Sequence, residues 1–235
     1  MIEVRIVDTP DAATTAALAE LDLVLARTPR PLVSFATGAT FAGLYARLAA
    51  RGPLPPQLLA THLDEYLGFR PGDRGGMVHE IVTSCPPLGE MLRRGTFLPV
   101  PSSGEPQELA AHARKLAAAG GIELQFLGIG RNGHLAFNEP GTARDLGFHR
   151  TLLAGTTRTD ARARFAPAQV PREAVTAGLA TILGARRIVL LATGTSKRAA
   201  VQAMLAGGIG AQTPASYLRE HEHTLVVLDR AAAGP

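Results

Sequence analysis

The chain has 235 residues, a formal net charge of +4 and one cysteine, Cys85. This length suffices for one large domain with a sizeable core, and a single cysteine excludes an intramolecular disulfide or a cysteine-based metal cluster. The lysines and arginines are scattered along the chain, which disfavours nucleic-acid binding. No amino-terminal signal peptide or long uncharged apolar span is visible, so we expect a cytoplasmic protein with no membrane contact.

Apolar runs alternate along the chain with Ala-rich amphipathic stretches, and no linker or fixed-period repeat divides them. We predict strands at 3–7, 32–36, 58–63, 97–100, 122–127, 187–193 and 224–228. We predict helices near 10–27, 39–51, 106–119, 172–183 and 196–206. Pro106 and Pro171 stand where a first helical turn tolerates proline. The alternation predicts one α/β domain over residues 1–235, a Rossmann-like three-layer fold with a mainly parallel sheet and helices on both faces.

Two of the predicted strands run into helices through turns of small residues. The first turn is Thr-Gly-Ala-Thr at 37–40, and the second, at 193–196, is followed by Lys197. Such turns point free backbone N–H groups and the positive end of a helix dipole outward, which suits a phosphate. Lys197 in a first helical turn is unfavourable for the helix alone, and a bound anion would offset that. An ordinary turn and a solvated lysine are the competing interpretations.

A third strand end carries two adjacent carboxylates, Asp64 and Glu65, followed by Tyr66. A carboxylate in a partly dry cleft has a raised pKa and can act as a general base near neutral pH. A solvated strand end is the competing interpretation of this pair. Tyr66 fits a role in packing better than a role in catalysis.

The most informative segment follows the predicted strand at 122–127 and covers residues 128–141. Its glycines free the backbone to turn sharply. Asn132, His134 and Glu139 can hydrogen-bond, orient one another and exchange protons. A turn with an exposed histidine and glutamate is the alternative, but the glycine spacing and the other three strand ends favour a functional site.

These segments together resemble those of the glucosamine-6-phosphate deaminases, also called glucosamine-6-phosphate isomerases. The family pattern has Thr-Gly-(Gly/Ser)-Thr, then Asp-Glu-Tyr, then Gly-x-Gly-x-(Asp/Asn)-Gly-His-(Ile/Leu)-(Ala/Gly)-Phe-Asn-Glu-Pro. The matching stretches here are residues 37–40, 64–66 and 128–140, together with 170–178, the Lys197 turn and 214–218. The resemblance spans nearly the whole chain.

The resemblance implies an aldose–ketose isomerisation with loss of ammonia, from glucosamine 6-phosphate and water to fructose 6-phosphate and ammonium. His134 would move a proton between O5 and O1 as the sugar ring opens. Glu139 would hold one ring nitrogen of His134, and Asn132 would orient both by hydrogen bonds. Asp64 would take the C2 proton and deliver it to C1 through a cis-enolamine. The resemblance implies no metal ion and no cofactor, and the partner is a small sugar phosphate.

The resemblance also assigns a phosphate site. Its residues would be Thr37, Gly38, Ala39, Thr40, Arg164 and Lys197. Arg164 precedes Phe165, as in an Arg-Phe pair of the family, and Arg158 and Arg162 are the alternatives. The stretch from about 145 to 170 lacks strong periodicity and lies between two site motifs, so we expect a mobile lid there.

Three alternatives to this activity stay open. The related 6-phosphogluconolactonases share the fold and the Gly-His turn. They typically have Asp-Glu-Arg and lack Phe-Asn-Glu-Pro, so Tyr66 and residues 137–140 favour the deaminase. The other two alternatives are a deaminase for another 2-amino sugar 6-phosphate, such as galactosamine 6-phosphate, and a catalytically inactive sugar-phosphate-binding module.

The chain departs from the family pattern at several positions. Asn132 stands where many members have Asp, and Phe41 where proline is usual. Residues 74–78 replace the family's Ser-Tyr-(Tyr/Phe), in a loop that would contact the sugar or a neighbouring subunit. Residues 148–152 do not reproduce the basic segment of an N-acetylglucosamine 6-phosphate site, and the chain ends at Pro235, soon after its last predicted strand. We therefore expect the short, non-allosteric subclass, as a monomer or small homo-oligomer.

Overall fold

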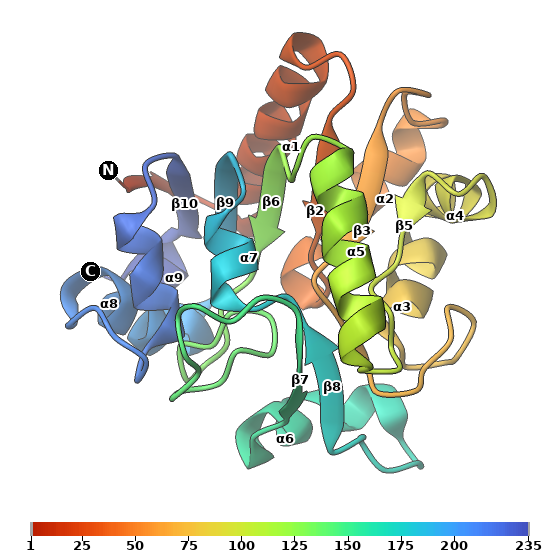
Figure 1. Cartoon of the computed structure of the whole chain (residues 1–235). Helices are drawn as coiled ribbons and strands as arrows, with labels where there is room; N and C mark the ends of the chain where they lie inside the picture. Colours follow the sequence, from red (N-terminus) through yellow and green to blue (C-terminus); the bar gives the residue numbers. More distant parts are fainter. Residues whose placement is uncertain (1, 235) are drawn as a thin grey trace.

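Within residues 2–234, which the computed structural model describes, seven parallel strands form a central sheet in the order β1–β10–β9–β6–β2–β3–β5 (Figure 1). The strands are β1 (Glu3–Val7), β2 (Leu32–Phe35), β3 (Leu59–His62), β5 (Phe97–Leu98), β6 (Leu124–Leu127), β9 (Arg187–Ala192) and β10 (Thr224–Asp229). The strands β2, β3, β6 and β10 are buried along their whole length. This burial explains their nearly continuous apolar runs, because a parallel sheet is covered on both faces.

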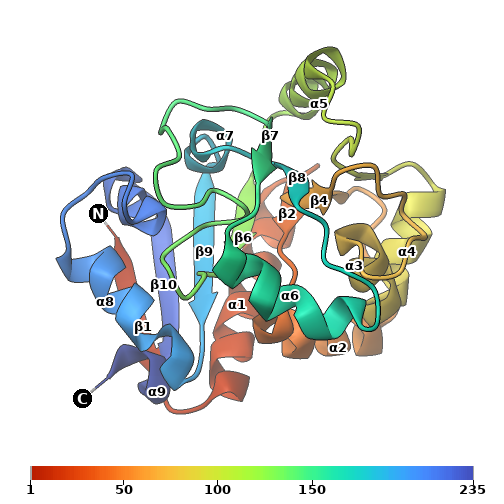
Figure 2. The ribbon, with the colours of Figure 1, turned by 90° about the horizontal axis from the view of Figure 1, so that it is seen from below.

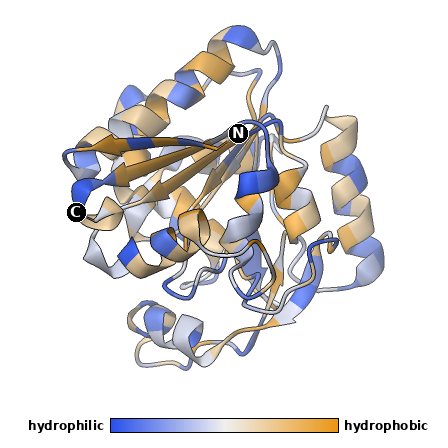
Figure 3. Ribbon diagram, turned by 90° about the vertical axis from the view of Figure 1, so that its left-hand side faces the viewer, coloured by the Kyte–Doolittle hydropathy of each residue, from blue (hydrophilic) through white to orange (hydrophobic). Residues whose placement is uncertain are grey.

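Helices cover both faces of this sheet. Figures 1 and 2 show α5 (Pro106–Ala118) and α7 (Leu179–Leu183) on one face, and α1 (Pro10–Arg27) and α2 (Ala42–Arg51) on the other. The structure also has α3 (Met77–Ser84), α4 (Pro86–Arg93), α6 (Gly155–Phe165), α8 (Arg198–Ala206), α9 (Arg230–Ala233) and 3-10 segments at Ala39–Phe41, Thr195–Lys197 and Pro214–Glu220. The strands of the sheet are mostly hydrophobic in Figure 3, whereas the helices are mixed, as expected for amphipathic helices that enclose a core.

A second, smaller sheet stands at the carboxyl end of the main sheet. Its antiparallel strands follow the order β4–β8–β7, with bounds β4 (Asp64–Tyr66), β7 (His149–Leu152) and β8 (Glu173–Thr176). Only Leu63 separates β4 from β3, and the Leu63 carbonyl accepts a hydrogen bond from the N–H of Ala177 at 2.7 Å. The helix α6 lies beside this small sheet (Figures 1 and 2).

A small hydrophobic cluster joins α6 to the small sheet. The Phe165 ring packs edge-on against Tyr66, with ring centroids 4.9 Å apart, and Tyr66 also contacts Phe137 at 5.6 Å. The buried members of the cluster are Tyr66, Met77, Phe137, Leu153, Phe165, Val170 and Ala174. Tyr66 therefore has the packing role that its sequence context predicts, and α6 rests on the strand that carries Asp64.

The structure confirms the α/β class, the mainly parallel sheet and each predicted strand, but the helix predicted at 172–183 is wrong in its first half. These residues form β8, and only the last five form α7. Val175 and Thr176 are β-branched and pair with both neighbouring strands of the small sheet. Gly178 follows the strand, where a Cβ would come 2.1 Å from a backbone carbonyl oxygen. Pro171 therefore precedes a strand and does not open a helix.

Sequence patterns also missed α3, α4, α6 and the small sheet. The helix α6 is polar, and only Thr157 and Phe165 of its residues are buried, so it shows no apolar period. The helices α3 and α4 are short and are separated only by Cys85, with Pro86 at the first position of α4. Among the described residues, no helix is long and apolar enough to cross a membrane.

Candidate active site

A cleft of about 470 Å³ lies at the carboxyl edge of the main sheet. It is lined by residues that follow four neighbouring strands, β2, β3, β6 and β9, and by residues of α6. The lining includes the whole turn at 37–40, Asp64, His134, Arg164 and Lys197. The strand ends singled out in the sequence therefore converge on one cavity, because parallel strands end at the same edge of a sheet.

The adjacent carboxylates of Asp64 and Glu65 have different environments. Glu65 accepts hydrogen bonds from three backbone N–H groups, two of them at the start of α3, at 2.9 to 3.0 Å. Asp64 is 6 % exposed and lines the cleft. Burial, and then the nearby Glu65 carboxylate, raise the pKa of Asp64 to about 8, against the opposing effect of Arg164. Asp64 is thus the carboxylate suited to proton transfer, whereas Glu65 holds the first turn of α3.

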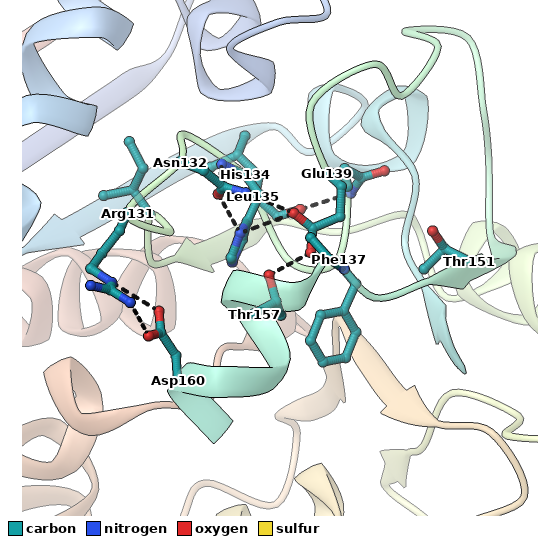
Figure 4. A network of polar contacts seen from close by, with 12 residues as sticks. Arg131, Asn132, His134, Leu135, Phe137, Glu139, Thr151, Thr157 and Asp160 are labelled. Atoms are coloured by element: carbon teal, nitrogen blue, oxygen red, sulfur yellow. Dashed lines mark hydrogen bonds and ion pairs between the residues drawn. The ribbon is translucent and has the colours of Figure 1, made fainter. Parts of the chain in front are cut away.

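His134 lines the cleft, and Asn132 and Glu139 hold its ring (Figure 4). The Asn132 Oδ1 lies 2.7 Å from His134 Nδ1, and the Asn132 Nδ2 donates to Glu139 Oε2 at 2.9 Å. Glu139 Oε2 is 3.6 Å from His134 Nδ1. The nearest partner of the ring is therefore Asn132, and Glu139, to which the resemblance assigned this contact, acts mainly through the Asn132 amide.

This arrangement fixes which ring nitrogen of His134 carries the proton. An ionised Glu139 can only accept hydrogen bonds, so the Asn132 amide must turn its NH₂ toward Glu139 and its oxygen toward the ring. His134 Nδ1 then donates, and Nε2 keeps its lone pair in the neutral ring. The ring lies close against Gly130, where a Cβ would come within 2.2 to 2.4 Å of ring atoms. A residue with a Cβ at position 130 would therefore clash with the His134 ring, and glycine avoids this clash.

Glu139 connects this histidine to α6. Its Oε1 accepts a hydrogen bond from the hydroxyl of Thr157, a residue that the sequence patterns did not single out (Figure 4). Burial alone raises the pKa of Glu139, but the nearby His134 ring and the hydrogen bonds from Thr157 and Asn132 outweigh it and lower the pKa to about 2. Glu139 is therefore an anion at neutral pH and stabilises positive charge on the His134 ring.

The residues that the resemblance assigned to phosphate line the same cleft. Gly38 has φ +106°, a conformation that side-chain-bearing residues rarely adopt. Lys197 Nζ donates to a backbone carbonyl at 2.7 Å, and burial lowers the pKa of this ammonium. Arg164 is in the lining, whereas Arg158 and Arg162 are not. The geometry thus favours Arg164 among the three arginines of α6.

Two further residues at the cleft were not among the predicted site residues. Met77 lines the cleft and belongs to the segment 74–78 that departs from the family pattern, so this departure touches the site. Glu80 contacts two lining residues: its Oε1 accepts from the Gly38 N–H at 2.8 Å, and its Oε2 lies 2.7 Å from Arg164 Nη2. Because α3 was not predicted, no sequence signal placed Glu80 beside the turn.

Comparison with known proteins identifies the family. Residues 76–227 match the model of the family described as glucosamine-6-phosphate isomerases/6-phosphogluconolactonase. A glucosamine-6-phosphate deaminase of Hahella chejuensis is 36% identical over 99% of this chain and 91% of its own length. Another, of Rhodopirellula baltica, is 38% identical over 99% of this chain and 95% of its own length. The chain belongs to this family, as its motifs indicate.

Solved structures agree with this assignment. A monomeric glucosamine-6-phosphate deaminase superimposes with a TM-score of 0.87 at 30% identity, covering 98% of both chains. A 6-phosphogluconolactonase of Trypanosoma cruzi superimposes with a TM-score of 0.79 at 16% identity, over 99% of this chain and 96% of its own. At that identity the second likeness shows the fold alone.

Proposed function

We propose that this protein is a glucosamine-6-phosphate deaminase, which converts glucosamine 6-phosphate and water into fructose 6-phosphate and ammonia. The observation that carries the proposal is the presence of Asp64, His134 and an anion-suited turn in one cleft. Two relatives that match over nearly their full length bear this name. The proposed reaction needs a base at C2 and an acid–base group at the ring oxygen, and Asp64 and His134 are the candidates for these two roles.

His134 opens the sugar ring in this proposal. Its Nε2 lone pair takes the proton of the O1 hydroxyl and returns it to O5 as the C1–O5 bond breaks, which leaves an open-chain aldehyde. The ring is a cation between these two steps. Asn132 and the ionised Glu139 behind Nδ1 stabilise that cation and keep the ring in one orientation.

Asp64 then moves the proton that converts the aldose to a ketose. In its ionised form it takes the proton from C2 while a proton of the substrate's ammonium group passes to O1, which gives a cis-enolamine, and Asp64 then delivers its proton to C1. The resulting iminium carbon at C2 adds water and releases ammonia, which gives fructose 6-phosphate. A pKa near 8 lets one carboxyl group accept and return a proton with little energetic penalty.

The substrate's phosphate would lie against the turn at 37–40, with Arg164 and Lys197 as its cationic partners. Charge-assisted bonds from a guanidinium and an ammonium to phosphate are stronger than neutral hydrogen bonds. This set of groups recognises a sugar phosphate but does not distinguish glucosamine from galactosamine at C4. Met77 lines the cleft in the segment where the family pattern has a polar Ser-Tyr. Because this difference lies at the cleft, galactosamine 6-phosphate is the second candidate substrate.

We further propose that residues 145–170 act as a lid. The helix α6 lines the cleft, and two contacts tie it to the loop that carries His134: the hydrogen bond from Thr157 to Glu139, and an ion pair between Arg131 and Asp160 (Figure 4). Opening of the lid would break both contacts.

The likeness to a deaminase described as monomeric supports a monomer. The cytoplasmic location stays a prediction.

The decisive assay offers purified protein three compounds: glucosamine 6-phosphate, galactosamine 6-phosphate and 6-phosphogluconolactone. We expect ammonia and fructose 6-phosphate in equal amounts from the first, with Asp64→Asn as the inactive control. Lactone hydrolysis without ammonia release from either amino sugar would contradict the proposal. Faster release from galactosamine 6-phosphate would reassign the substrate and leave the reaction class in place.

A further inference from the structure

The proposed mechanism leaves one acidic group beside the cleft without a role. Glu80 lies on α3, one turn after Met77, and its side chain is 25 % exposed. One carboxylate oxygen accepts from the Gly38 N–H at 2.8 Å, and the other lies 2.7 Å from Arg164 Nη2. The carboxylate thus bridges the turn at 37–40 and the helix α6.

Gly38 and Arg164 are the groups that the proposed function gives to the substrate's phosphate. A carboxylate and a phosphate use the same kinds of donors, a backbone N–H and a guanidinium, with two oxygens of the anion engaged at once. Glu80 therefore satisfies these donors in the way that a bound phosphate would. Another guanidinium nitrogen of Arg164, Nη1, donates to the weak acceptor Met77 Sδ, at 3.2 Å.

The contact between Glu80 and Gly38 can be compared with a similar contact elsewhere in the molecule, between Asp229 and Gly194. Gly194 has nearly the same backbone conformation as Gly38, with φ and ψ of 86° and 156° against 106° and 163°. Its N–H is also held by a carboxylate, that of Asp229. Asp229 is 3 % exposed and also caps α9 through the N–H of Ala232, so it is fixed. Glu80 is a quarter exposed on a longer, rotatable side chain, so its contact can exchange.

The charges around the turn also indicate that Glu80 and a phosphate compete for the same donors. Arg164 and Lys197 provide two positive charges beside the turn, and Glu80 cancels one of them. Like charges a few ångströms apart repel by about 1 kcal/mol in bulk water and by several times more at a half-buried site. A phosphate dianion and the Glu80 carboxylate therefore cannot share these donors without a large penalty.

We propose that Glu80 is an internal anion that competes for the phosphate-binding donors, and that a sugar phosphate binds by displacing it. This inference rests on the proposed function, which places a phosphate at the turn. It makes Glu80 a determinant of affinity: the residue lowers the affinity for phosphate-bearing ligands and leaves the proton-transfer groups in place.

The test is the variant Glu80→Gln, with inorganic phosphate as the probe in titration calorimetry. We expect phosphate to bind about tenfold more tightly to the variant, because the negative charge that competes for Arg164 is removed. The KM for glucosamine 6-phosphate should fall by a similar factor while kcat changes little. Glu90→Gln is the matched control, since this glutamate is ion-paired on α4 away from the cleft and should leave phosphate affinity unchanged.

Unchanged or weaker phosphate binding in Glu80→Gln would overturn the inference. Weaker binding would show that Glu80 positions Arg164 for the ligand. A gain of undiminished size when Arg164→Ala is added would also overturn it, because part of the competition must act through that guanidinium. Failure of the proposed function is separate: it would appear as absence of ammonia release by the native protein, whatever the phosphate titrations show.

Discussion

Replacing Asp64 with asparagine should stabilise the protein at alkaline pH while it removes the activity. Burial and the Glu65 carboxylate raise the pKa of Asp64 from 3.8 to about 8. Between these values the unfolded chain carries an ionised aspartate and the folded chain a protonated one. Folding then requires uptake of a proton, so this residue's contribution to stability is fully present below about pH 4 and is lost as pH rises toward 8.

The size of the effect follows from the pKa shift. Each unit corresponds to about 1.36 kcal/mol, so the contribution of Asp64 to the free energy of unfolding should fall by about 4 kcal/mol between pH 5 and pH 8. An asparagine is neutral at every pH and escapes this loss. The difference in unfolding free energy between Asp64→Asn and the native protein should therefore grow by that amount over the same range.

Urea unfolding of both proteins at pH 5, 6.5 and 8 measures this difference. Taking it at each pH cancels the titration of other groups, such as His62 and His112, whose pKa values burial lowers to about 3 and about 4. Asp22→Asn is the control, since this aspartate is half exposed in an ion pair and its replacement should change stability little. A difference for Asp64→Asn that stays flat from pH 5 to 8 would refute the reasoning.

The kcat of Asp64→Asn should fall on the order of a hundredfold or more, and near-normal turnover would mean that another group is the base.

The remaining predictions concern the pH profile, the phosphate site and regulation. The value of kcat/KM for glucosamine 6-phosphate should rise with pH up to about 8 and level off only above that, because the base must be ionised in the free enzyme; a flat profile from pH 6 to 8 would count against Asp64. Lys197→Ala should raise KM about tenfold or more with little change in Tm, and calorimetry with phosphate checks it. Gly38→Ala should cost about 1–3 kcal/mol of stability and raise KM, whereas Gly52→Ala, also at positive φ but outside the cleft lining, should lose stability with KM unchanged. Saturation by substrate should be hyperbolic, and N-acetylglucosamine 6-phosphate should not alter it; a sigmoidal curve that this compound makes hyperbolic would show an allosteric enzyme.

The main sheet was predictable because burial on both faces leaves continuous apolar runs in the sequence. The small sheet was not, because β4 opens with two carboxylates and β7 alternates between half-buried and exposed residues, so neither leaves an apolar run. Residues 172–176 show where prediction of secondary structure from local sequence fails. Their composition fits a helix as well as a strand, and pairing with residues about 25 and 110 positions earlier decides the outcome.

The site shows the same division between local and distant information. Asn132, His134 and Glu139 lie within eight residues on one glycine-rich loop, so their chemistry could be inferred from the sequence. The roles of Asp64 and Glu65 could not be separated, because the distinction depends on the start of α3, twelve residues further along. Glu80 was invisible for the same reason, since its partners Gly38 and Arg164 lie 42 residues before it and 84 after it.

Asn132 shows how one departure from a family pattern can preserve a function while it changes the physical means. An aspartate at this position would place a second carboxylate beside Glu139, and the pair would hold a histidine cation by charge. With asparagine, one carboxylate remains, and the amide passes its orienting effect to His134 Nδ1 through two hydrogen bonds. The tautomer is then set by which end of the amide faces Glu139 and not by a carboxylate in contact with the ring. Since Glu139 stays ionised with a pKa near 2, this orientation does not change across neutral pH. The Asn132 loop can therefore keep Nε2 available as a base, as the proposed ring opening requires.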